Sequence, residues 1–299
     1  MTFALNDPEA AAQLTLAQVQ MLERQGETLR DIKIQNQRLL WLAIQQDWHQ
    51  QMQTPRYRDQ RHLVPYGYKT YSQTDEDGII AEIFRRIGTG QQRFIEFGVE
   101  TGIECNTMNL LIQGWSGLWL DGSAQHLQKI SERLGAYQAA GQLVAAHAFI
   151  MAENINDLFV QNGFTGEIDL LSIDIDGNDF WVWQAINVIN PRVVIIEYNA
   201  TWRPPVAVVQ PYQADSMWNG HDNYFGASLE ALEKLGRQKG YALVGCNYGG
   251  GNAFFVRNDL AREELFMAPF TARQHYEPPR FFFALTAGHP PAVGPLIQV

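Results

Sequence analysis

The sequence predicts an α/β fold around an open, Rossmann-like sheet of seven strands, mostly parallel, with an antiparallel last strand. Short apolar segments alternate with amphipathic ones from about residue 66 to residue 240, as in chains that build βαβ units. The segment 192–197 is almost continuously apolar, which is typical of a strand buried in a parallel sheet. Two further apolar segments flank a glycine-rich turn at 247–252 and indicate a closing hairpin.

The N-terminal part of the chain differs from the rest. Residues 9–53 are rich in Gln, Leu and Ala, with a single Gly and no Pro, which favours one long helix. A heptad seam runs along it through Leu22, Leu29, Ile32 and Leu39, with Asn36 at a further a position and Gln18, Gln25 and Gln46 at d positions. This imperfect seam leaves two readings open. The helix pairs with another copy, or it packs against its own domain.

Pro55 and the charged stretch 56–61 are typical of a linker. We therefore expect an N-terminal helical segment at residues 1–60 and an α/β domain at 61–299. After a helix that ends at Gly88, strands are expected at 93–98, 117–121, 143–150, 168–174, 192–197, 241–246 and 253–257. The intervening helices are expected at 106–113, 124–138, 154–161, 179–187 and 228–239. The long aromatic stretch 198–226 has the length of a functional loop.

Composition excludes several classes of protein. The formal net charge of −10 argues against a nonspecific nucleic-acid binder, which needs clustered Lys and Arg. The first residues lack the pattern of a signal peptide, and no apolar stretch approaches the length of a membrane span. Cys105 and Cys246 belong to no metal-binding pattern and are expected to be reduced thiols. We expect a soluble, cytoplasmic protein with no nucleic-acid partner.

A candidate cofactor site lies at the end of the first expected strand. Glu96 is followed by Gly98 and Gly102, and ligands of open α/β sheets bind at the carboxyl ends of such strands. Gly98 permits a sharp turn and a close approach of the backbone. The next strand ends in Asp121, an acidic residue of the kind that binds ribose hydroxyls.

Glu100 distinguishes between two classes of cofactor. It stands where a dinucleotide fingerprint has its middle glycine, and a carboxylate there would repel a pyrophosphate. S-adenosylmethionine (SAM) carries a sulfonium and an amino acid and has no phosphate. The motif therefore favours SAM over a nicotinamide cofactor.

Five runs carry a resemblance to a known family: SQ-x-x-ED at 72–77, FIEFGVETGIECNT at 94–107, GWSGLWLDGS at 114–123, LLSIDIDGNDFWVW at 170–183 and VVIIEYNA at 193–200. They resemble the FkbM-type branch of SAM-dependent methyltransferases over about residues 66–257, without the N-terminal helix. The resemblance implies a class I methyltransferase fold and methyl transfer to a hydroxyl of a sugar, polyketide or similar small molecule. It also implies cofactor contacts by Glu96, Gly98, Gly102 and Asp121, with Glu153 and Asn154 near the adenine.

Polar groups for the chemistry follow the fourth and fifth strands. Asp174, Asp176, Asp179, Glu197 and Asn199 stand at or beyond the strand ends. Asp174, Glu197 and Asn199 form a tentative Mg²⁺ set, because carboxylate and amide oxygens are the ligands that hard cations prefer. The alternative is that Asp174 contacts SAM or the acceptor directly, while Asp176 and Asp179 cap the following helix.

His221, in the long loop, is a candidate general base, as are Asp174 and Glu197. A surface histidine on a flexible loop is the equally open alternative. The leading hypothesis is therefore a SAM-dependent O-methyltransferase acting on a small molecule or glycan. A nicotinamide- or nucleotide-dependent enzyme and a non-catalytic SAM-binding oligomeric scaffold remain as alternatives, and nucleic-acid methylation is a weaker one.

Overall fold

The computed structural model describes residues 8–214 and 223–280, with side chains from residue 18 onward. The chain divides into two compact units, residues 1–51 and 52–299. The first unit is a single long helix, α1 (Pro8–Met52), close to the helix expected at 9–53. The four apolar seam residues, Leu22, Leu29, Ile32 and Leu39, are exposed. Within the described ranges, no helix is both long and apolar enough to cross a membrane.

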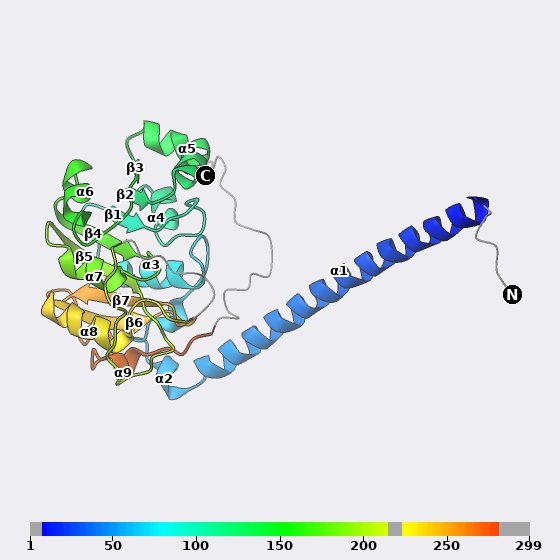
Figure 1. The fold of residues 1–299 in the computed structure, drawn as a ribbon. Helices are drawn as coiled ribbons and strands as arrows, with labels where there is room; N and C mark the ends of the chain where they lie inside the picture. Colours follow the sequence, from blue (N-terminus) through cyan, green and yellow to red (C-terminus); the bar gives the residue numbers. More distant parts are fainter. Residues whose placement is uncertain (1–7, 215–222, 281–299) are drawn as a thin grey trace, which may run out of the picture. The chain divides into compact units, whose positions relative to one another are not determined.

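The second unit contains a seven-stranded sheet in the order β3-β2-β1-β4-β5-β7-β6, which confirms the predicted fold class (Figure 1). The pairs β1–β2, β2–β3, β1–β4 and β4–β5 are parallel. Only β7 runs antiparallel, pairing with both β5 and β6. The order reverses between β1 and β4, and in open sheets ligands bind beyond the carboxyl ends of the strands at such a point.

The observed strands are β1 (Arg93–Phe97), β2 (Ser116–Asp121), β3 (Leu143–His147), β4 (Gly166–Ile173), β5 (Ile189–Glu197), β6 (Tyr241–Cys246) and β7 (Asn252–Arg257). The helices of this unit are α2 (Pro55–Arg58), η1 (Val64–Tyr66), α3 (Glu76–Ile87), α4 (Met108–Ile112), α5 (Ala124–Ala139), α6 (Ile155–Gln161), α7 (Asp179–Ala185), α8 (Leu229–Gln238) and α9 (Ala272–His275). Each strand predicted from the sequence is present, with ends that differ by a few residues.

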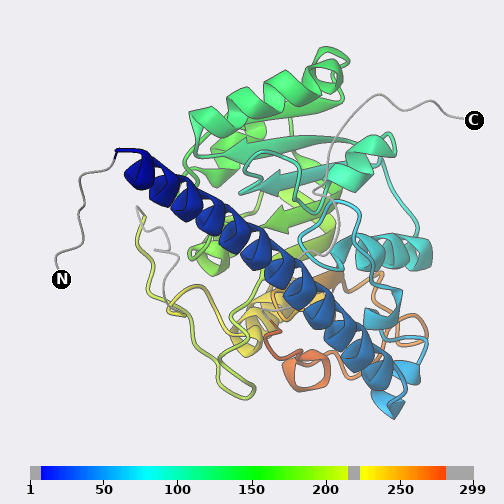
Figure 2. The same cartoon turned by 90° about the vertical axis from the view of Figure 1, so that its right-hand side faces the viewer.

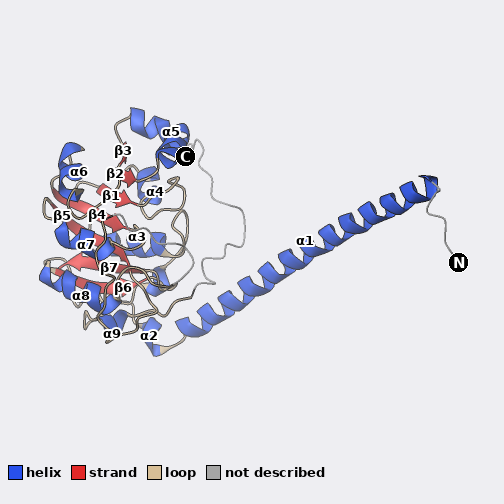
Figure 3. Ribbon diagram, viewed as in Figure 1, coloured by secondary structure: helices blue, strands red, loops and turns tan. Residues whose placement is uncertain are grey.

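Helices cover both faces of the sheet, as Figure 3 shows with strands in red and helices in blue. On one face α6, α7 and α8 bury residues such as Phe159, Trp183 and Leu232 against the sheet. On the other face, toward which Figure 2 looks, α3, α4 and α5 bury Ile83, Leu111 and Ile130. The near-continuous apolar run of β5 has the two-sided burial that a central strand requires.

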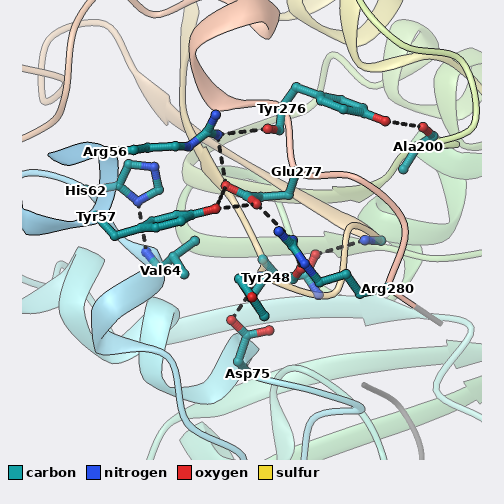
Figure 4. A network of polar contacts seen from close by, with 12 residues as sticks. Arg56, Tyr57, His62, Val64, Asp75, Ala200, Tyr248, Tyr276, Glu277 and Arg280 are labelled. Atoms are coloured by element: carbon teal, nitrogen blue, oxygen red, sulfur yellow. Dashed lines mark hydrogen bonds and ion pairs between the residues drawn. The ribbon is translucent and has the colours of Figure 1, made fainter. Parts of the chain in front are cut away.

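Residues 55–61, expected to be a linker, are instead part of the second unit, so its boundary lies earlier than the predicted residue 60. Tyr57 in α2 is buried, and its hydroxyl donates to both carboxylate oxygens of Glu277 at 2.9 and 2.7 Å. Arg56 and Arg280 pair with the same carboxylate at 2.8 and 3.0 Å (Figure 4). We call this set the Glu277 cluster. It joins the first turn of the unit to its last described segment.

Candidate functional site

A cavity of about 620 Å³ lies at the carboxyl ends of β1, β2, β4 and β5, within the size range of small-molecule sites. The antiparallel β7 begins at the same edge and adds Asn252 to the wall. Seven carboxylic acids line the cavity: Glu96, Glu100, Glu104, Asp121, Asp174, Asp176 and Glu197. Among the described lining residues there is no Lys or Arg.

Gly98 lies between the β1–β2 side of this cavity and its β4–β5 side. Its φ of +77° lies in the left-handed region, and a Cβ there would stand 1.6 Å from the carbonyl oxygen of Asp174. Position 98 therefore requires glycine, as predicted. The reason is that the backbone of Asp174, just after β4, leaves no room for a side chain. Glu100 also takes a left-handed conformation, with φ +49°, and its amide donates to Asp121 at 2.8 Å.

Glu96 lies fully inside the protein, and each of its carboxylate oxygens accepts two hydrogen bonds. One oxygen accepts from the amide of Asn106 at 2.9 Å and the hydroxyl of Ser172 at 3.1 Å. The other accepts from the amide and the hydroxyl of Thr107 at 2.9 and 2.6 Å. Burial raises the pKa of Glu96, and these donors oppose the rise. Glu96 therefore holds the loop between β1 and α4 in place.

Asp121 ends β2 at the cavity wall and is also held by the protein. One carboxylate oxygen accepts from the amide of Glu100, and the other accepts from the amide of Ser123 at 2.8 Å. The second oxygen also lies 3.0 Å from Nδ1 of His126. The carboxylate is oriented by these contacts, and its first oxygen retains capacity for a ligand donor.

Three predicted cofactor residues do not line the cavity. A Cβ at Gly102 would stand 2.5 Å from the ring of Trp119, so this glycine serves packing. The carboxylate of Glu153 accepts from Tyr212, and Asn154 bonds the backbone of Met151 and Phe149. Residues 148–150, which follow β3 directly, line the wall instead.

Asp174, Asp176 and Glu197 gather at the other side of the cavity, with carboxylate oxygens within 4.8 Å of one another. Burial raises the pKa of Asp174 well above its usual range, and the carboxylates of Asp179 and Asp176 raise it further. Burial and then the charge of Asp174 raise the pKa of Glu197 in the same way. No residue in the described ranges donates a hydrogen bond to Asp174 or Glu197, which explains why nothing offsets these shifts.

Asp179 and Asn199 have internal roles. Asp179 accepts from the amides of Ile175 and Gly177, both at 2.9 Å, and so shapes the loop after β4. Asn199 is buried, donates to the carbonyls of Asn223 and Phe225, and accepts from the amide of Thr201. Among the described acids, Asp176 joins Asp174 and Glu197 in a cluster of possible metal ligands.

Asn252 is a site residue that the sequence reasoning missed. It is only 8% exposed, its Nδ2 donates to Glu76 at 3.0 Å, and its Oδ1 has no partner among the described residues. It lies opposite Glu197 in the β5–β7 register. The signal was available, since an antiparallel strand after the hairpin turn must begin at the edge where the parallel strands end.

The long loop after β5 is described up to residue 214 and again from residue 223, so His221 lies outside the described residues. Its first half packs beside the cavity. Asn178, which lines the cavity, donates to the carbonyl of Gln213 at 2.7 Å, and Trp181 donates to that of Gln210 at 2.8 Å. These contacts place part of the loop beside the site, as expected of a cover.

No family model and no curated protein matches the chain. Among solved structures it is similar to the methyltransferase domain of bacterial CtHen1 (12% identity, 62% of this chain and 97% of that one, TM-score 0.40). It is similar to a SAM-dependent methyltransferase from Clostridium acetobutylicum (13% identity, 63% of this chain and 92% of that one, TM-score 0.38). It is also similar to the glycopeptide N-methyltransferase MtfA (13% identity, 60% of this chain and 94% of that one, TM-score 0.39).

Proposed function

We propose that this protein is a SAM-dependent methyltransferase of the FkbM type that methylates a hydroxyl group of a small molecule or glycan. One observation carries the proposal. The cavity at the switch point of the sheet is lined by acidic residues and, among those described, by no Lys or Arg. Such a wall favours a cationic cofactor and disfavours the pyrophosphate of a dinucleotide, which needs amide or basic donors. The same charge argues against a nucleic-acid acceptor.

The residues at the β1–β2 side fit SAM. Asp121 is oriented at the end of β2 to accept from ribose hydroxyls, and Gly98 leaves the loop backbone beside the cavity. Glu96 acts by positioning this loop, and Phe149 and Ile150 offer apolar wall for the adenine. When bound, SAM supplies an electrophilic methyl group on a sulfonium.

The residues at the β4–β5 side fit proton removal from the acceptor. Asp174 and Glu197 lie close together and both have a raised pKa, which suits a carboxylate that takes up a proton. The ionised carboxylate of Asp174 or Glu197 takes the proton that the acceptor hydroxyl loses as its oxygen is methylated. His221 remains a sequence-based candidate for the same role.

Mg²⁺ is a second candidate occupant of the β4–β5 side. The oxygens of Asp174, Asp176 and Glu197 are grouped closely enough to bind one hard cation. The cation would orient the acceptor hydroxyl and favour its deprotonation. Asn199 donates within the loop through Nδ2 and accepts from Thr201 through Oδ1, and it stays a sequence-based candidate ligand.

The test is calorimetric titration of the purified protein with SAM, its demethylated product and NAD⁺, with and without Mg²⁺. We expect SAM and its product to bind and NAD⁺ not to bind. Binding of NAD⁺ alone would move the assignment to a nicotinamide enzyme. Binding of none of the three would favour a non-catalytic scaffold.

We further propose that α1 joins copies of the chain into an oligomer through Leu22, Leu29, Ile32 and Leu39, which are exposed at heptad spacing. Deleting residues 1–51 should then reduce the solution mass to that of a monomer, and an unchanged oligomeric state would contradict the proposal. Deleting residues 1–60 is a poorer control, since it also removes Arg56 and Tyr57 from the Glu277 cluster. Cys105 and Cys246 are buried free thiols, which is consistent with the proposed cytoplasmic location.

A further inference from the structure

The acceptor side of the cavity contains a buried amide with a fixed orientation. Nδ2 of Asn252 donates to a carboxylate oxygen of Glu76, which also accepts from Thr74 and Asn247 at 2.8 and 2.9 Å. A carboxylate ringed by donors only accepts, so the amide of Asn252 cannot be reversed. Its Oδ1 must therefore face away from Glu76, and no described residue donates to it.

Oδ1 of Asn252 belongs to a group of hydrogen-bond acceptors. Because Asn252 and Glu197 are paired in the antiparallel register, their side chains lie on the same face of the sheet, and both line the cavity with Asp174. None of the three oxygen groups receives a donor from a described residue. Of the three, Oδ1 of Asn252 is fully buried, and a buried acceptor without a donor costs about 1–3 kcal/mol, so an occupant that donates to it is stabilised.

Charge narrows the class of occupant further. His126 is the one basic side chain among the described lining residues, and it is bonded to Asp121 on the cofactor side. A phosphate or carboxylate placed near Asp174 and Glu197 would meet two acids and no cation. An ammonium group has three donors and no acceptor, which matches two carboxylates and one amide oxygen.

We propose that the methyl acceptor is a polyhydroxylated amine, of the amino-sugar class, whose ammonium group donates to Asp174, Glu197 and Asn252. This inference rests on the proposed function and names its substrate class. Mg²⁺ at the same carboxylates is the competing occupant. The ammonium is favoured because Asp176, the third acid of the metal cluster, is exposed, whereas the half-buried Asp174 and Glu197 and the buried Asn252 give one acceptor group for each ammonium hydrogen.

The test is calorimetry on the full chain saturated with demethylated SAM. Glucosamine, galactosamine and mannosamine are each compared with the neutral parent sugar and the corresponding uronic acid. We expect at least one amino sugar to bind about tenfold or more tightly than its parent, and the uronic acids not to bind. Binding of no amino sugar, or equal binding of an acid, overturns the inference. So does Mg²⁺ binding that Glu197→Gln abolishes and that no amino sugar displaces.

Three variants locate the effect. Glu197→Gln and Asn252→Ala should each weaken amino-sugar binding about tenfold, while Asp157→Asn, an exposed acid on α6 outside the lining, should leave it unchanged. Thermal unfolding shows that each variant is folded. Unchanged binding in Glu197→Gln overturns the inference even if Asn252→Ala fails to fold. The proposed function fails separately, because its loss is seen as absent SAM binding in the wild-type chain.

Discussion

At the β1–β2 side of the cavity, every oxygen of Glu96 and Asp121 accepts a hydrogen bond from the protein. At the β4–β5 side, Asp174 and Glu197 have no described donor, and burial raises the pKa of both. The first side is organised by the chain itself before any ligand binds. The second side carries a destabilising charge pair that an occupant can relieve, and such local cost is characteristic of functional sites.

Gly98→Ala should have the largest effect on stability and on SAM binding, because this residue lies between the two sides of the cavity. The added Cβ would stand 1.6 Å from the carbonyl of Asp174, at a φ of +77° that disfavours side chains. We expect a loss of about 4 kcal/mol in unfolding free energy and no measurable SAM binding. Gly163→Ala is the matched control, since its φ is +76° with nothing within 4 Å, and it should lose only about 1 kcal/mol. Equal effects in urea unfolding would contradict this account.

Glu96→Gln tests the β1–β2 side, where the carboxylate oxygens already accept hydrogen bonds from the protein. The amide places an NH₂ group against donors that need an acceptor, among them the backbone amides of Asn106 and Thr107. We expect about 3 kcal/mol of destabilisation and weaker SAM binding, through a displaced loop. Calorimetry and chemical unfolding measure both. A variant as stable as the wild type would show that the Glu96 contacts do not organise the loop.

Glu197→Gln is the same chemical change at the β4–β5 side of the cavity. We expect it to raise the stability of the fold, whereas Glu96→Gln lowers it. The substitution removes a carboxylate whose charged form is disfavoured by burial and by the neighbouring Asp174, so we expect added stability, seen as a Tm higher by several degrees. Methyl transfer should fall at least tenfold, because a carboxylate and an acceptor for the substrate are lost. A lowered Tm in differential scanning calorimetry would refute the comparison.

The smallest expected effect is the pH dependence of the stability difference between Glu197→Gln and the wild type. Because the pKa of Glu197 is raised above its usual 4.5 in the folded state, the folded form holds the proton more tightly than the unfolded form. Wild-type stability from this group is therefore full below about pH 4.5 and declines as pH rises toward the folded pKa. The Tm advantage of Glu197→Gln should be small at pH 4.5 and should increase by a few degrees at pH 8. An advantage that is constant with pH would exclude the charge pair as its cause.

The strands could be predicted because their signal is local. The apolar run of β5 and the Gly98 turn identify a parallel sheet and its ligand edge from adjacent residues. What could not be predicted depends on distant partners. Glu76, 176 residues before Asn252 in the chain, fixes the orientation of that amide. Glu96 was expected to contact the cofactor, but its hydrogen bonds with Thr107 and Ser172 depend on how the loop and β4 pack.

The same limit explains the linker prediction. Charged residues before a domain resemble a linker by composition, and nothing local shows that Tyr57 meets Glu277, 220 residues away. Glu153 and Asn154 were assigned from the resemblance. The residues after β3 that line the cavity are 148–150, and Asn154 bonds the backbone of Met151.

The Glu277 cluster has a consequence for the synthesis of this protein. Arg56 and Tyr57 leave the ribosome long before Glu277, whose carboxylate they share. Until then the half-buried Arg56 and the buried Tyr57 lack their acceptor, and α2 is not joined to the segment that follows α9. A nascent chain stopped before residue 277 should therefore remain open to proteases, while one extended past residue 280 and out of the exit tunnel should become resistant.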